Sequence, residues 1–117
     1  MTSRSRTSAK RQQTPELLAL VATRFRALAE PARLAILHAL SGGERTVTEL
    51  VETTGLGQGN LSKHLQQLYA GGFVGRRREG LFVYYALADK DVLALCEIMC
   101  SRIENDIDAS AKIVAAR

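Results

Sequence analysis

The chain has 117 residues, 46% of them apolar, and a formal net charge of +4. This length predicts one domain with a hydrophobic core and argues against wholesale disorder. No stretch resembles a membrane span or a secretory signal, so we expect a cytoplasmic protein, and the two cysteines are too few for a disulfide framework.

Basic residues are concentrated before the last segment of the chain. Residues 1–88 hold 12 basic and 6 acidic residues, a balance of +6, whereas residues 89–117 hold 4 and 6, a balance of −2. This distribution suits a body that meets a polyanion and a last helix that meets protein. Residues 1–14 are basic and polar, and we expect a disordered arm that either contacts phosphates or is only solvated.

Two helices are expected at the start of the folded part. A hydroxyl cap, a proline and an acid at positions 14–16 predict a helix start, and apolar residues then recur every three or four positions up to Leu28. This pattern predicts a helix over 15–29. Pro31 starts a second helix, because proline suits a first turn, and Ser41-Gly42-Gly43 ends it.

A short helix, a glycine turn and a longer helix follow. Thr46 or Thr48 caps the short helix, and Thr46 has Glu49 at the capping-box position. Gly55-Leu56-Gly57 breaks this helix. The longer helix is predicted from Gln58 to about Ala70, with three leucines directed inward at Leu61, Leu65 and Leu68.

The apolar pattern changes to a period of two between Phe73 and Leu87, which predicts a hairpin with a tight turn at Glu79-Gly80. A long helix is then expected over 89–115, with Asp89 as its cap. Its apolar seam has steps of three and four and one polar break, at Val92, Cys96, Met99, Ile103, Ile107, Ser110 and Val114.

The longer helix of the pair is the candidate for reading DNA, because the second helix of a helix-turn-helix enters the major groove. The residues at its N-terminal end that we expect to face outward are Gln58, Gly59, Asn60, Ser62 and Lys63. Gln and Asn pair with adenine, and Lys reaches phosphate or guanine. The 26 residues between Glu52 and Glu79 hold no acid, as a surface facing DNA requires. The alternative is a generic helical hairpin with a polar face.

The hairpin adds three consecutive arginines, Arg76, Arg77 and Arg78, just before its turn. Consecutive residues on a strand point to alternate sides, so one or two of them can meet backbone phosphate while the rest are solvated. Directly after a helix-turn-helix, this triplet indicates a DNA-binding wing.

Residues 24–88 resemble the ArsR/SmtB family of bacterial winged-helix repressors. The most specific parts of the resemblance are Leu61-Ser62-Lys63-His64-Leu65 with Leu68, then Gly72-Phe73-Val74, then Arg78-Glu79-Gly80 leading to Val83-Tyr84-Tyr85. The resemblance implies a mainly α fold with a β-hairpin wing in the order ααααββα. It also implies a homodimer paired through the helices at 15–29 and 89–115, and repression at an inverted-repeat operator until an effector binds.

Carried over to this chain, the resemblance places Gln58, Asn60, Ser62 and Lys63 in the groove and gives His64 a packing role or a phosphate contact. Leu81 departs from the pattern, because many relatives have a basic residue after the turn glycine.

Two metal sites common among such repressors do not fit this chain. The third helix lacks a Cys-x-Cys pair, and Asp91, Arg102 and Asn105 occupy positions where a zinc site across the last helices would need further ligands. The remaining candidates are Cys96 and Cys100, four residues apart on one helix face. Two thiolates suit a thiophilic metal or metalloid ion, or redox sensing, whereas buried cysteines also serve as plain core residues.

The sequence also bears on functions other than effector-controlled repression. An enzyme needs a nucleophile with its base or a metal site, and the sequence offers neither, so we expect no catalytic activity. The alternatives are a winged-helix module that binds another protein, and a ligand-independent DNA-binding regulator with structural cysteines.

Overall fold

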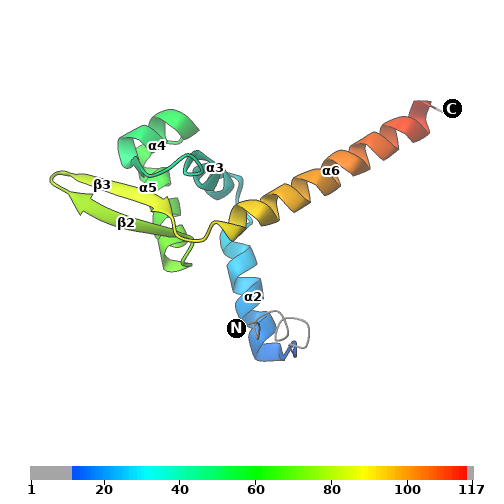
Figure 1. Cartoon of the computed structure of the whole chain (residues 1–117), viewed down its shortest axis with the longest axis horizontal. Coiled ribbons are helices and arrows are strands. Elements are labelled where there is room, and N and C mark those ends of the chain that lie inside the picture. Colours follow the sequence, from blue (N-terminus) through cyan, green and yellow to red (C-terminus); the bar gives the residue numbers. More distant parts are fainter. Residues whose placement is uncertain (1–11, 116–117) are drawn as a thin grey trace, which may run out of the picture.

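The computed structural model describes residues 12–115, so the predicted basic arm lies almost entirely outside the described residues. The elements, in chain order, are α2 (Pro15–Leu28), α3 (Pro31–Ala39), β1 (Arg45–Thr46), α4 (Val47–Thr54), α5 (Gln58–Ala70), β2 (Val74–Glu79), β3 (Phe82–Leu87) and α6 (Asp91–Ala115). Helices α3, α4 and α5 and the sheet form a body, and α2 and α6 extend from it in different directions (Figure 1). The predicted helices and hairpin are all present.

Short-range hydrogen bonds fix where the helices begin and end. Thr14 Oγ1 accepts from the N–H of Leu17 at 3.1 Å, and Pro15 occupies the first turn of α2. Gly55 ends α4 with a φ of 75°, in the left-handed region that glycine adopts without steric cost. Asp89 accepts from the N–H of Asp91 at 3.0 Å, so α6 begins two residues after the predicted cap.

The sheet has three antiparallel strands in the order β1–β3–β2, one more strand than predicted. Strand β1 has only two residues, with Arg45 opposite Tyr85 and Thr46 opposite Tyr84. It was missed because two residues cannot display a period of two. The hairpin turns at Gly80, whose φ is 63°, and Leu81, and a glycine with positive φ at the first central position is typical of a type II′ turn.

One hydrophobic core lies beneath α5 and the sheet. It contains the three predicted leucines of α5 and aliphatic or aromatic side chains from the other elements of the body, and its buried members are Ile36, Leu37, Leu40, Leu50, Leu61, Leu65, Leu68, Phe73, Val74, Tyr85 and Val92. Each fully buried leucine contributes on the order of 1.5–3 kcal/mol relative to leaving it in water. The core therefore holds α5 against the body by one face and leaves its other face open.

Helices α2 and α6 have a different surface from the rest of the molecule. Of the 12 large apolar side chains exposed in the described part of the chain, nine lie on these two helices. They are Leu18, Leu20, Val21, Phe25, Leu95, Ile98, Met99, Ile103 and Ile107. Among the residues whose side chains are described, helix α6 joins the core through its first turn, where Val92 is buried and Leu93 packs against the core. Both helices thus present apolar surface that the chain itself does not cover.

A search of the described helices for a segment able to cross a membrane found none.

Candidate DNA-binding surface

The N-terminal end of α5 is exposed, with its buried leucines behind it. Leu61 and Leu65 are 0% and 1% exposed, which fixes the rotation of the helix about its own axis. The five residues predicted to face outward are all exposed, at Gln58, Gly59, Asn60, Ser62 and Lys63. We call these five residues the reading tip. Gly57 provides no side-chain cap, so the first N–H groups of α5 are free of such a partner and favour an anion.

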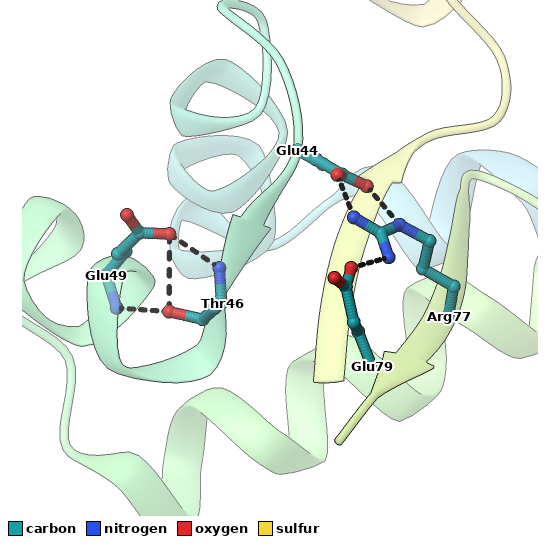
Figure 2. A network of polar contacts seen from close by, with 5 residues as sticks. All are labelled: Glu44, Thr46, Glu49, Arg77 and Glu79. Atoms are coloured by element: carbon teal, nitrogen blue, oxygen red, sulfur yellow. Dashed lines mark hydrogen bonds and ion pairs between the residues drawn. The ribbon is translucent and has the colours of Figure 1, made fainter. Parts of the chain in front are cut away.

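Helix α4 packs against α5, the helix that carries the reading tip. Its start is a complete capping box, in which the Thr46 N–H donates to Glu49 Oε1 at 2.8 Å and the Glu49 N–H donates to Thr46 Oγ1 at 3.2 Å (Figure 2). Thr46 is therefore the cap, and not Thr48, the other residue predicted for that position. Leu50 is fully buried in the core that also holds Leu61, so α4 and α5 pack as a helix-turn-helix around Gly55.

The three wing arginines have three different environments. Strand register places Arg76 opposite Tyr85, Arg77 opposite Tyr84 and Arg78 opposite Val83, so Arg77 points to the side opposite the other two. The guanidinium carbon of Arg76 lies 4.0 Å from the centroid of the Tyr69 ring, which joins the wing to the end of α5. Arg78 is exposed and has no ion-pair or hydrogen-bond partner among the described residues.

Arg77 is bound by two carboxylates rather than free in solvent, which differs from its prediction as a phosphate contact or a solvated residue. Its Nε donates to Glu44 Oε2 at 3.0 Å, and its two terminal nitrogens pair with Glu44 and Glu79 (Figure 2). Its guanidinium also stacks over the Tyr84 ring, with its carbon 4.5 Å from the ring centroid. The hydrogen bonds from Arg77 lower the pKa of Glu44, and the two carboxylates raise the pKa of Arg77. Arg77 thus braces the wing against the segment before β1.

His64 lies on the flank of α5 and not at its open face. It is half-buried, and its Nδ1 accepts a hydrogen bond from Arg33 Nε at 3.2 Å. Of the two predicted roles for His64, packing agrees with this contact, and the phosphate contact stays a prediction. Sequence reasoning missed Arg33 and Glu44 because their partners lie 31 and 33 positions along the chain. It missed Tyr69 because no local pattern marks its contact with Arg76 across the end of α5.

Cys96 and Cys100 are free thiols on α6, the first half-buried and the second exposed. Burial raises the pKa of Cys96, and the neighbouring Cys100 raises it further. The two cysteines are four residues apart in α6, a spacing that puts them on the same face of the helix. Within the described part of the chain, no group of three or more His, Cys, Asp or Glu side chains is placed to hold a metal ion.

The helix-turn-helix and wing match a known family. The sequence model of the family described as "Bacterial regulatory protein, arsR family" matches residues 30–75. The HTH-type transcriptional regulator Rv0081 of Mycobacterium tuberculosis is 36% identical over 98 residues, which cover 80% of this chain and 86% of that protein. This chain belongs to the ArsR family. The crystal structure of Rv0081 superimposes with a TM-score of 0.71 at 37% identity and covers 80% of this chain and 97% of that one.

Two further relatives extend the comparison with the ArsR family. A solution structure from Mycobacterium bovis, described as a homodimeric winged helix-turn-helix DNA-binding domain, is 35% identical with a TM-score of 0.70 and covers 86% of this chain and 94% of that chain. The "probable mercury resistance operon repressor" of Streptomyces lividans is 44% identical over 71 residues, which cover 61% of this chain and 57% of that protein. This chain thus spans little more than half the length of that curated relative. The relatives are named as transcriptional regulators and not as enzymes.

Proposed function

We propose that this ArsR-family chain is a sequence-specific transcriptional repressor that binds an inverted-repeat operator as a homodimer. The observation that carries the proposal is the reading tip, an exposed and acid-free helix end held by buried leucines. Asn60 and Gln58 offer the amides that pair with adenine, and Lys63 offers a charge for phosphate or guanine. Arg78 supplies a free cation on the adjacent wing for backbone phosphate.

The homodimer is supported by the uncovered apolar faces of α2 and α6. A groove of about 780 Å³ lies beside α2, and the apolar side chains that line it include Leu17, Leu20 and Val21. Exposed apolar surface of this extent is typical of an interface rather than of a monomer. Pairing of two chains through these helices would cover both faces at once, as the resemblance to repressors of this family predicts.

Charge favours α6 of a second copy as the occupant of the groove. Arg24, Arg26 and Arg33 line the groove, and no acidic residue does. Helix α6 carries five acids, at Asp91, Glu97, Glu104, Asp106 and Asp108, against two bases, at Arg102 and Lys112. Helix α6 also carries exposed apolar side chains, which we call its apolar ridge, at Leu95, Ile98, Met99, Ile103 and Ile107. An acidic helix with such a ridge therefore complements a basic groove that is also lined by apolar side chains.

The dimer is tested by sedimentation of the full chain. Ile98 is 61% exposed and lies on the apolar ridge, so Ile98→Glu is expected to yield a monomer with weakened operator binding. Leu81→Glu is the matched control, because Leu81 is 93% exposed but lies on the wing, and it should leave the chain dimeric. A wild-type chain that sediments as a monomer at micromolar concentration would contradict the pairing.

Operator binding is tested by selection from random duplex DNA. A dimer with two reading tips related by a two-fold axis should select a palindrome whose half-sites lie about one helical turn, or a multiple of it, apart. Binding should weaken steeply with added salt. Selection of nothing above background, with salt-independent capture of a protein instead, would favour the alternative of a protein-interaction module.

We further propose that Cys96 and Cys100 bind a thiophilic ion that releases the repressor from DNA. The two thiols are four residues apart on one face of α6, and soft metal ions prefer thiolate ligands and displace the thiol protons. Burial raises the pKa of Cys96, which reduces the fraction of thiolate open to direct oxidation, whereas a bound soft ion displaces the thiol proton. The relative from Streptomyces lividans is named for mercury, which is itself thiophilic.

The effector proposal is tested by measuring operator release with Hg²⁺, arsenite, Cd²⁺, Cu⁺, a persulfide and peroxide. Wild type is expected to respond to at least one of the four metals or metalloids, and the Cys96→Ser/Cys100→Ser variant to none of them. A double variant that responds like wild type would show that the cysteines only pack. Release by peroxide alone would favour redox sensing instead.

A further inference from the structure

Arg33, on α3, forms side-chain hydrogen bonds to two other helices, α2 and α5. Its Nε donates to Nδ1 of His64 on α5 at 3.2 Å, and its Nη1 donates to the backbone oxygen of Ala27 on α2 at 3.1 Å. Both hydrogen bonds are part-buried. A single planar guanidinium therefore spans from the last turn of α2 to the middle of the recognition helix.

Each end of this bridge satisfies a group that needs a partner. Ala27 lies in the last turn of α2, where carbonyl groups have no partner within the helix and carry the negative end of its dipole. A cation at that carbonyl is favourable on both counts. At the other end, His64 Nδ1 accepts, so the proton of its neutral ring must lie on Nε2.

We infer that Arg33 is a positioning residue for DNA reading: it fixes the tautomer of His64 and ties the recognition helix α5 to α2. This inference rests on the proposed function, in which α2 belongs to the dimer interface. The distance between the two reading tips of the dimer then depends on how firmly α5 is held to α2. Arg33 holds α5 to α2 through its two hydrogen bonds, and in this proposal it contacts no phosphate itself.

The first test is the tautomer of the two histidines in the full ¹⁵N-labelled chain. His38 is a built-in control, because its Nδ1 lies 2.8 Å from the Leu34 carbonyl and must donate a proton to it. Long-range ¹H–¹⁵N spectra are expected to show His64 protonated at Nε2 and His38 at Nδ1. Arg33→Gln should abolish the preference at His64 and leave His38 unchanged. Wild-type His64 protonated at Nδ1 would overturn the inference.

The second test separates positioning from direct phosphate contact by salt dependence. Arg33→Gln and Arg33→Lys should each weaken operator binding about tenfold, roughly the loss of one charge-assisted hydrogen bond, because lysine cannot span both acceptors. The slope of log affinity against log salt should stay that of wild type in both variants. Lys63→Ala, at a predicted phosphate contact, should instead lower the slope by about one. A slope lowered by about one in Arg33→Gln would place Arg33 on the phosphate and overturn the inference.

Variants of His64 test the same link from the other side. His64→Asn keeps an oxygen near the position of Nδ1 and should bind DNA almost as wild type, whereas His64→Gln removes that acceptor and should behave like Arg33→Gln. The double variant Arg33→Gln/His64→Gln should be no weaker than Arg33→Gln alone, because that single variant already lacks both hydrogen bonds. Additive losses would contradict the link. If wild type itself fails to bind duplex DNA, the proposed function fails, whatever the tautomer of His64.

Discussion

Arg77 on β2 forms an ion pair with Glu44, a residue 33 positions earlier in the chain, and the pair holds the wing to the segment before β1 (Figure 2). Both side chains are partly open to solvent, at 49% and 39% exposure, so water screens their attraction. The value of the pair therefore lies in orienting the wing rather than in global stability. Its neighbour Arg78 keeps its charge free.

The Glu44 pair predicts a specific pH dependence of wing order. The pKa of Glu44 is lower in the folded chain than its ordinary value of 4.5, because Arg77 donates hydrogen bonds to it. The stabilisation it gives is therefore present above pH 4.5 and is lost as the pH falls through the lowered value. Relative to the intrinsic exchange rate at each pH, the protection of amides in β2 and β3 should fall over that acid range in wild type. Glu44→Gln should exchange fast throughout, and Glu52→Gln, exposed and outside any ion pair of the described residues, should match wild type.

The wing arginines should differ in their effect on DNA binding. Arg78→Ala is expected to weaken binding to all sequences alike and to lower the salt slope by about one, because it removes one free cation from the wing. Arg77→Ala should loosen the hairpin, which faster amide exchange would reveal, with a smaller change in slope because its charge is already balanced. Equal slopes in the two variants would contradict this assignment.

Substitutions in the reading tip should separate discrimination between base pairs from the electrostatic affinity for any duplex. Asn60→Ala is expected to lose about 1–3 kcal/mol of discrimination at one base pair in each half-site, while binding to random duplex changes little. Lys63→Ala should weaken binding to specific and random duplex by a similar factor. Competition assays with single-base operator variants measure both. If Asn60→Ala leaves the discrimination between base pairs unchanged, the Asn60 amide does not contact a base in the groove.

The core beneath the reading tip should be sensitive to truncation. Leu61 is fully buried, so Leu61→Ala is expected to cost about 2–5 kcal/mol of unfolding free energy through lost burial and the cavity left behind. Leu81→Ala makes the same change at a side chain 93% exposed and should stay within about 0.5 kcal/mol of wild type. Urea unfolding of both variants at one protein concentration checks the difference. Similar losses would mean that Leu81 is covered in solution.

Local patterns predicted most of the fold. The Thr46 and Glu49 spacing located the start of α4, and the recurrence of Leu61, Leu65 and Leu68 located the buried face of α5, because both depend on residues within one or two helical turns. The two-residue strand β1 gave no such signal, since its pairing with β3 is set by tertiary contact.

The site was predicted less completely than the fold. Exposure of the reading tip followed from helical periodicity alone. The different contacts of Arg76, Arg77 and Arg78 could not be predicted in this way. Strand alternation predicts the face of the sheet on which each arginine lies, but not the residue that it contacts on that face. Glu44 and Arg33 meet their partners across 33 and 31 positions, and only the folded chain brings such residues together.

Beyond its first turn, α6 takes no part in the body that carries the reading tip. Residues of its apolar ridge can therefore change without disturbing the contacts to bases, provided that the two chains of the dimer still fit together. Where a cell makes several regulators of this architecture, such a ridge would decide which chains assemble and which stay apart. Mixed pairs, and the hybrid half-sites they would occupy, would then depend on how α6 of one chain fits the groove beside α2 of the other.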